Sequence, residues 1–312
     1  TCAIPESLYY KRMLIWNSDP YFNKVKLVEP DTTFNDWYTE YPFFKEDVNA
    51  TYLGVIGSAT QNFNYFKRHD FDIAPFYSYY LPYTYTAESM RMYNVKSPCT
   101  ELAYWGTLFS YKDKEESSAR FMHTQNITPH LNLQLEFHMF GGKGILSREA
   151  TNNRTFTLTG NYLGERYVAN GGFISNTIKR DENGGIVNTS DVRDTTFDAK
   201  TIAINLNQAS NRITKRTFFL NHSYGIPIRF KKQKDSLGRD TLDAGAGTMA
   251  YFGHSFEYSF YTKFYSDQIA RTDTKGREFY YNNFFIHPYQ SADSMRVSNL
   301  DNKLFFRLQP WS

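Results

Sequence analysis

Apolar and polar residues alternate with a period of two in a series of short segments between about Thr100 and Gln309. In the clearest segment, Leu131, Leu133, Leu135, Phe137 and Met139 alternate with Asn132, Gln134, Glu136 and His138. Successive side chains of a β-strand point to opposite faces of a sheet, so this stretch separates an apolar surface from a polar one. The pattern is typical of two architectures, a soluble β-sandwich and a membrane β-barrel.

Composition favours strands and leaves both architectures open. Phe, Trp and Tyr make up 18% of the chain, with 25 Tyr and 27 Phe, and aromatic residues are good strand formers. The mean hydropathy of −0.58 does not exclude a membrane barrel, in which only every second strand residue needs to be apolar. No stretch has the roughly 18 apolar residues of a transmembrane helix. No signal peptide opens the chain, so in an exported protein we expect Thr1 to follow a processing site.

Charge argues against a nucleic-acid partner, and the two cysteines leave a disulfide open. The net charge is +3, and Lys and Arg are scattered rather than clustered with aromatic residues, so we expect no nucleic-acid partner. The two cysteines, Cys2 and Cys99, would be able to form a disulfide in an oxidising periplasm, or would remain free.

Turn residues divide the second part of the chain into ten predicted strands. These lie near residues 100–111, 116–126, 130–141, 152–163, 166–178, 199–207, 213–225, 250–263, 278–287 and 301–309. Each is close to the ~10 residues that a tilted strand needs to cross a bilayer. Short turns near 126–129, 163–165 and 207–212 alternate with long connections at 142–151, 179–199 and 226–249, as in outer-membrane barrels. The connection near 265–277 should be short in this pattern and is long.

The first 96 residues are less regular. They contain many turn formers, and the best strand candidate is Thr51 to Ile56. We therefore expect two parts, an irregular segment at 1–96 that forms either a plug or the first strands, and barrel strands at 97–312.

The phase of each strand predicts two sets of side chains. The set expected to line a pore is Asn132, Gln134, Glu136, Thr157, Thr159, Asn161, Ser255, Glu257, Ser259, Lys303 and Arg307. The set expected to face lipid is Leu131, Leu133, Leu135, Phe137, Phe156, Leu158, Phe256, Tyr258, Phe260, Leu304 and Phe306. In segments 166–178 and 213–225 apolar residues fall on both faces, which indicates contact with a plug or a partner. Aromatic residues expected near strand ends, in interfacial girdles, are Trp105, Tyr111, Tyr162, Tyr167, Tyr224, Tyr251 and Tyr261.

Six short motifs, in order, resemble the putative porin family of Bacteroidetes outer membranes. They are Thr51-Tyr52-Leu53-Gly54 with Gly57-Ser58, Thr100 to Tyr104, His123 to Pro129, Thr151 to Phe156, Glu182 to Ile186, and Phe218 to Leu220. The resemblance spans roughly residues 31–261 and implies an outer-membrane β-barrel without naming a solute. Family members look longer, and this chain ends in Pro310-Trp311-Ser312 rather than in a terminal aromatic residue. These departures suggest that this chain is the front portion of a larger barrel.

The sequence contains no catalytic or metal-binding motif. There is no GxSxG elbow, P-loop or Rossmann fingerprint, and the seven histidines form no HExxH pair. Glu136 and Glu257 are expected to supply lumen charge rather than acid/base catalysis. We therefore expect neither an enzyme nor a cofactor or metal site.

Three functions are compatible with these observations. The leading one is an outer-membrane porin for passive diffusion of small hydrophilic solutes, with outer-membrane lipid or lipopolysaccharide as its surroundings. The second is an accessory β-barrel subunit of a larger outer-membrane assembly for secretion or insertion, in contact with other outer-membrane proteins. The third is a soluble carbohydrate-binding sandwich. If the faces are correctly assigned, Leu133→Arg should cost about 2–4 kcal/mol near the midplane, whereas Gln134→Arg should be tolerated.

Overall fold

The structure is a computed structural model that describes residues 12–28, 50–66, 73–107, 115–193, 198–228, 233–234, 240–241, 248–268 and 290–309. Cys2, Tyr111 and the strand expected at 278–287 lie outside the described residues. Cys99 begins a strand and is half-buried. Its disulfide with Cys2 stays a prediction, because Cys2 is not among the described residues.

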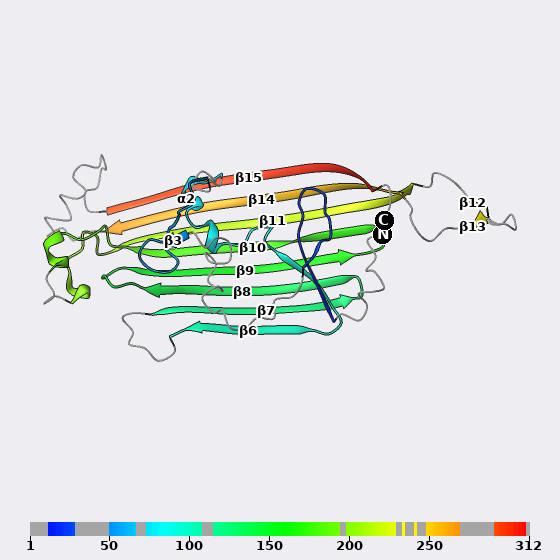
Figure 1. The fold of residues 1–312 in the computed structure, drawn as a ribbon. Helices are drawn as coiled ribbons and strands as arrows, with labels where there is room; N and C mark the ends of the chain where they lie inside the picture. The colour runs from blue at the N-terminus through cyan, green and yellow to red at the C-terminus, as the bar shows by residue number, and fades with distance from the viewer. Residues whose placement is uncertain are drawn as a thin grey trace.

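One antiparallel sheet of eight strands dominates the molecule (Figure 1). Its strands are β6 (Cys99–Gly106), β7 (Glu116–Thr128), β8 (Leu131–Lys143), β9 (Ala150–Leu163), β10 (Tyr167–Glu182), β11 (Ala209–Ile228), β14 (Thr248–Gln268) and β15 (Gln290–Gln309). Each strand pairs with the next one in this order, which is their order along the chain. The all-β antiparallel prediction is confirmed. Among the described residues the sheet is open, with β6 and β15 at its edges.

One predicted strand is wrong. Residues 199–207 form the short 3-10 helix η5 (Ala199–Thr201) and an isolated bridge between Ile204 and Ile186, and the next strand begins at Ala209. Asp198 caps the start of η5, since its side chain accepts a hydrogen bond from the Lys200 N–H at 3.1 Å.

Removing that strand changes which connections share an end of the sheet. At one end of the sheet, which we call the long-loop end, the chain leaves β6, β8, β10 and β14 and enters β7, β9, β11 and β15. The opposite end, which we call the short-turn end, has tight turns at 129–130 and 164–166, together with the longer connection 229–247, which includes β12 (Gln233–Lys234) and β13 (Asp240–Thr241). The long connection after β14 therefore fits the alternation, and 229–247 becomes the exception.

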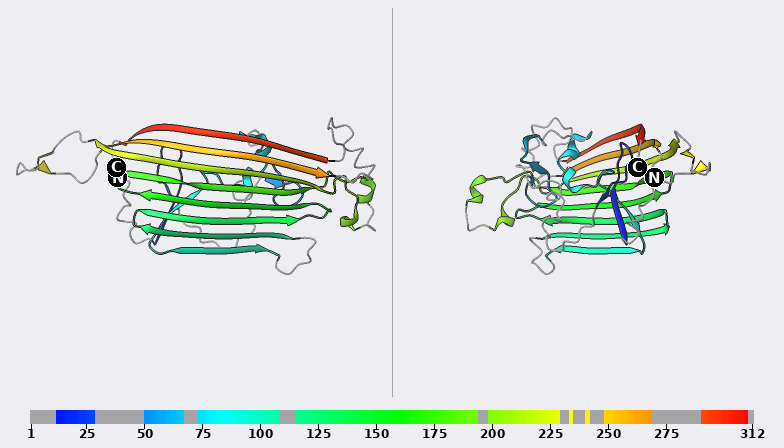
Figure 2. Two further views of the ribbon diagram at one scale, coloured as in Figure 1. Left: turned by 180° about the vertical axis from the view of Figure 1, so that it is seen from behind. Right: turned by 45° about the vertical axis from the view of Figure 1, so that its right-hand side comes forward.

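The N-terminal segment, by which we mean the described part of residues 12–95, lies across one face of the sheet (Figure 1). Its elements are β1 (Met13–Asn17), β2 (Leu27–Val28), β3 (Ala50–Tyr52), β4 (Thr60–Asn62), α2 (Pro75–Ser78), η3 (Leu81–Tyr83) and β5 (Arg91–Val95). They form a three-stranded sheet β2-β1-β5 and the hairpin β3-β4. Seen from behind, the opposite face of the large sheet has no such cover (Figure 2).

Two apolar clusters fix the N-terminal segment to the sheet. In the first, Trp16 and Met92 pack with Val168, Ile174 and Phe219 of β10 and β11. A second cluster joins residues around α2 and η3 to the sheet; it contains Val55, Ile56, Tyr77, Tyr80, Tyr83, Phe140, Ile178, Ile213 and Tyr261. These contacts explain why β10 and β11 carry apolar residues on both faces. None of the helices that the structure describes has the length and apolar character needed to cross a membrane.

Candidate functional site

The sheet places the two predicted sets of side chains on opposite faces. Cross-strand register puts Asn132 opposite Asn161, and Leu135 opposite Leu158, and the same alternation continues through β14 and β15. All eleven residues expected to line a pore lie on the face toward the N-terminal segment, which we call the inner face. All eleven residues expected to face lipid lie on the other side, which we call the outer face. Pore lining and lipid contact themselves stay predictions.

Burial on the two faces is the reverse of that in a soluble protein. On the inner face Thr157 is 0% exposed and Asn132 1% exposed, whereas on the outer face Leu304 is 86% exposed and Phe306 53% exposed. Soluble proteins rarely expose contiguous apolar patches of this kind. A β-sandwich would bury the apolar face against a second sheet, so the structure argues against the soluble interpretation.

The most continuous apolar row crosses the middle of the outer face. It joins neighbouring strands through paired residues, from β8 to β15: Leu135, Leu158, Phe173, Phe218, Tyr258 and Leu300. The rings of Phe173 and Phe218 lie 4.7 Å apart. Apolar residues continue from this row toward the short-turn end and form a belt.

Aromatic and histidine rings border this belt near the short-turn end. Tyr162 and Tyr167 have ring centroids 5.9 Å apart, and Tyr167 lies 6.0 Å from His222. Tyr224 pairs with Tyr167 across the strands and is exposed. These positions match the girdle expected for Tyr162, Tyr167 and Tyr224.

The other girdle residues are placed differently. Tyr251 and Tyr261 are buried on the inner face, where Tyr261 packs against Tyr77 of α2 at 5.5 Å, so their assignment to the girdle is wrong. Trp105 is opposite Ser118, which is buried on the inner face, so Trp105 also faces inward. An aromatic residue near a strand end therefore fits the interfacial girdle only when its side chain points to the outer face.

Polar side chains of the inner face hold the backbone of the N-terminal segment. Asn176 accepts a hydrogen bond from the Tyr85 N–H (3.2 Å) and donates one to the Tyr85 carbonyl (2.9 Å). Asn161 donates to the Tyr93 carbonyl at 2.9 Å. These amides act as backbone partners, as a neighbouring strand would.

A second set of contacts surrounds Asn23. Its side chain donates to the Val168 carbonyl and to the Ser223 hydroxyl, both at 3.0 Å, and accepts from Asn170 at 2.8 Å. Asn23 has a φ of +48°, a left-handed conformation that Asn adopts more readily than most residues. The buried Asn23 side chain thus anchors the loop after β1 to the sheet.

A charged cluster lies between the N-terminal segment and β7 and β8. The Arg120 Nε contacts Glu136 Oε1 at 2.8 Å, and Arg120 also reaches Glu101 at 3.4 Å. The Tyr85 hydroxyl donates to Glu136 at 3.1 Å and lies 3.4 Å from His138 Nδ1. Burial raises the pKa of Tyr85, and the nearby Glu136 carboxylate raises it further, so Tyr85 is a neutral donor.

The inner face is only partly covered along β14 and β15. Glu257, Lys303 and Arg307 are all half-buried there. Lys303 forms an ion pair with Asp301 at 2.9 Å, and its ammonium lies 4.7 Å from the ring centroid of Tyr21. Charged groups that remain accessible to water therefore gather at this side of the inner face.

The structure brings together no catalytic or metal-binding group among the described residues. Glu136 on β8 and Glu257 on β14 are four strands apart, or about 19 Å at ~4.8 Å per strand. His123 and His138 lie on opposite faces of the sheet. No group of three His, Cys, Asp or Glu among the described residues is arranged to hold a metal ion.

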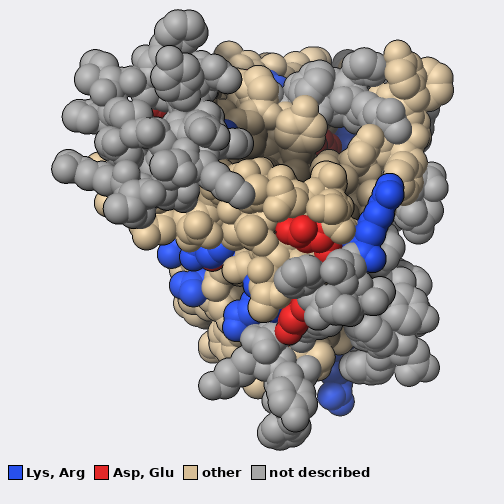
Figure 3. All heavy atoms as spheres, turned by 90° about the vertical axis from the view of Figure 1, so that its left-hand side faces the viewer, with Lys and Arg blue, Asp and Glu red and all other residues tan. Residues whose placement is uncertain are grey.

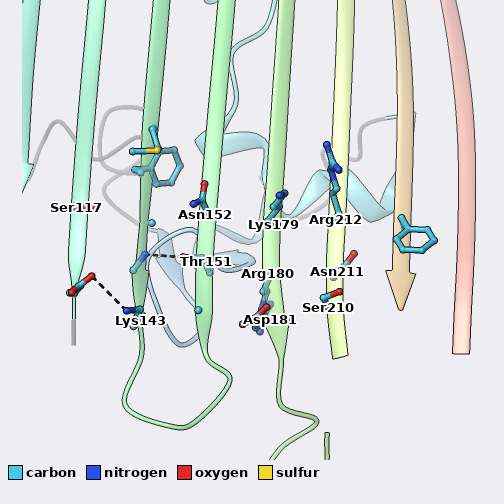
Figure 4. A pocket seen from close by; sticks show the side chains of 17 residues that line it. Ser117, Lys143, Thr151, Asn152, Lys179, Arg180, Asp181, Ser210, Asn211 and Arg212 are labelled. Atoms are coloured by element: carbon cyan, nitrogen blue, oxygen red, sulfur yellow. Dashed lines mark hydrogen bonds and ion pairs between the residues drawn. The ribbon is translucent and has the colours of Figure 1, made fainter. Parts of the chain in front are cut away.

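A hollow of about 670 Å³ opens at the long-loop end of β7 to β14 (Figure 4). Asn152, Lys179 and Arg212 lie side by side there, on three adjacent strands in direct register. Gly141 and Gly142 of β8 also line the hollow, and the Thr151 hydroxyl accepts a hydrogen bond from the Gly142 N–H at 3.2 Å. The phase analysis did not single out this basic pair, because charge at strand ends is common.

A family model described as "Putative porin" matches residues 13–311, which is nearly the whole chain. The chain belongs to this family. No curated protein and no solved structure matches it. The family match confirms the resemblance and extends it beyond residues 31–261, through both the N-terminal segment and β15.

Proposed function

We propose that this protein is an outer-membrane β-barrel porin through which small hydrophilic solutes diffuse, with a lumen narrowed by the N-terminal segment. One observation carries the proposal. The apolar face of the sheet is exposed, whereas its polar face is buried under the protein's own chain. Such a sheet is stable only if hydrocarbon covers its outer face, and membrane barrels have this polarity.

The solute path lies along β14 and β15. Over β8 to β11 the inner face is sealed by apolar clusters and by amide contacts to Tyr85 and Tyr93. Along β14 and β15, Glu257, Lys303 and Arg307 keep partial access to water. Charge at this side would then set ion selectivity.

The alternative role as an accessory subunit loses one of its motivations. Apolar residues on both faces of β10 and β11 suggested a partner protein, but Val168, Ile174 and Phe219 pack against the N-terminal segment of the same chain.

Conductance in planar bilayers tests the diffusion role. The full chain, purified and shown to be folded, should give discrete steps that increase with salt concentration. Lys303→Glu should shift the reversal potential in a KCl gradient toward cation selectivity, whereas Lys303→Arg should leave it unchanged. Absence of channels from inserted, folded protein would reject diffusion and leave the fold intact.

A further inference from the structure

The charged residues of the outer face are almost all basic. Lys143, Arg154, Lys179, Arg212, Arg216 and Arg296 point outward from strands between β8 and β15, whereas Asp181 is the single carboxylate on this face among the described residues. Asp181 is paired with Arg148 at 3.4 Å, and Lys143 lies 3.8 Å from Glu115. The other five basic residues are exposed, and no ion pair joins them to a described carboxylate. We call these five, Arg154, Lys179, Arg212, Arg216 and Arg296, the basic rim.

The basic rim is confined to one half of the sheet. Each member lies in the half of its strand nearer the long-loop end, beyond the row of Leu135 and Leu158. An Arg or Lys on the lipid face costs about 2–4 kcal/mol at the midplane but only about 0–1 near an interface. The rim therefore marks the level of the lipid headgroups. Figure 3, which views the long-loop end, shows Lys and Arg gathered along the left flank of the described surface.

Within the rim, like charges are neighbours. Lys179 and Arg212 are directly opposite each other on β10 and β11. Like charges in this position destabilise a sheet unless an anion lies between or beside them. An external anion would remove this repulsion.

Three arginines of the rim surround a hollow of about 310 Å³ on β11, β14 and β15. Arg212, Arg216 and Arg296 line it, together with Thr214 and Thr262, which are paired across the strands at its centre. Arg212 and Arg216 are about 13 Å apart along β11, and Arg296 lies two strands, about 10 Å, from Thr214. Arginine side chains can reach the centre from these distances.

The chemistry of this hollow fits a phosphate attached to a lipid. Guanidinium groups bind phosphate oxygens through paired, charge-assisted hydrogen bonds, and threonine hydroxyls can add donors. Phe260 and Phe264 also line the hollow; Phe260 lies two residues from Tyr258 of the apolar row, and Phe264 is exposed directly opposite Arg212. A free anion would gain nothing from these rings, whereas a lipid would place acyl chains against them.

We propose that the basic rim, through the hollow of Arg212, Arg216 and Arg296, binds the phosphate groups of a phosphorylated glycolipid in the membrane leaflet at the long-loop end. The inference rests on the proposed function, because it requires the outer face to lie in a membrane. It also orients the protein, with the long-loop end toward the glycolipid leaflet.

Native mass spectrometry of the full chain with added lipid tests the site. Bisphosphorylated lipid A should be retained by the wild type at least about tenfold more than its dephosphorylated form, and this preference should be lost in the triple variant R212Q/R216Q/R296Q. The control K24Q/K26Q/K96Q removes the same charge from exposed positions of the N-terminal segment and its flank and should keep the preference.

Three results would overturn the proposal: equal retention of both lipids by the wild type, unchanged preference in the triple variant, or complete displacement of lipid by millimolar inorganic phosphate. If the triple variant fails to fold, the comparison of the two lipids on the wild type still decides. Conductance of the same samples separates the two claims. Channels without lipid preference reject only the rim, and lipid preference without channels rejects only diffusion.

Discussion

Replacing Leu158 by arginine tests whether hydrocarbon covers the outer face. Leu158 belongs to the apolar row, between Leu135 on β8 and Phe173 on β10, and 47% of it is exposed outside the sheet. Full burial of a leucine contributes about 1.5–3 kcal/mol, so the exposed half is worth about 1 kcal/mol in lipid. An arginine near the midplane costs a further ~2–4 kcal/mol. We therefore expect Leu158→Arg to lower the free energy of unfolding by about 3–5 kcal/mol.

Asn152→Arg is the matched control. Asn152 lies on the same strand and the same face, about 20 Å nearer the long-loop end, where the basic rim already holds Lys179 and Arg212. Its replacement should cost only about 0–1 kcal/mol. Guanidinium titrations in lipid vesicles, followed by tryptophan fluorescence, give both values. If Leu158→Arg lay within about 0.5 kcal/mol of the wild type, or matched Asn152→Arg, the assignment of the outer face would be refuted.

Three further predictions concern the N-terminal segment. Asn176→Ala leaves the N–H and C=O of Tyr85 without their partner, so it should cost about 1–3 kcal/mol and speed hydrogen exchange around Tyr85; unchanged exchange would contradict this. Phe219→Ala should loosen the segment by about 3–5 kcal/mol and speed its proteolysis, whereas Phe218→Ala, which faces outward, should not. Burial raises the pKa of Tyr85 above the unfolded value of about 10, so the unfolded state loses its proton first as pH rises; stability should be complete below about pH 10 and decline above it, and an ultraviolet titration that showed Tyr85 ionising at pH 10 would refute this.

The strands of the sheet could be predicted because their alternation is a local property. Residues 131–140 alternate without interruption and lie within β8. The strand expected at 199–207 failed because Ile202, Ile204 and Leu206 alternate but pack as a loop, where Leu206 contacts Ala209. An alternation with a period of two does not by itself distinguish a strand from a loop in which every second side chain packs against the protein.

The cover over the inner face could not be predicted, because it depends on contacts between residues far apart in sequence. Asn23 and Asn170 are 147 positions apart, and nothing near either residue indicates the contact.

The N-terminal segment over the inner face also changes one expectation. Gln134 is buried and hydrogen-bonded to Glu136 at 3.3 Å and to Thr159 at 3.2 Å, so Gln134→Arg should destabilise the protein rather than be tolerated.

Spin labels placed on the two faces test the central claim most directly. In a C2S/C99S background reconstituted into bilayers, labels at Leu133 and Leu220 of the outer face should be accessible to oxygen and protected from a water-soluble nickel chelate. A label at Thr157 of the inner face should be immobilised and protected from both reagents, because the N-terminal segment covers it. Access of the nickel chelate to Leu133 and Leu220, with oxygen access no greater than on a soluble protein, would contradict the account.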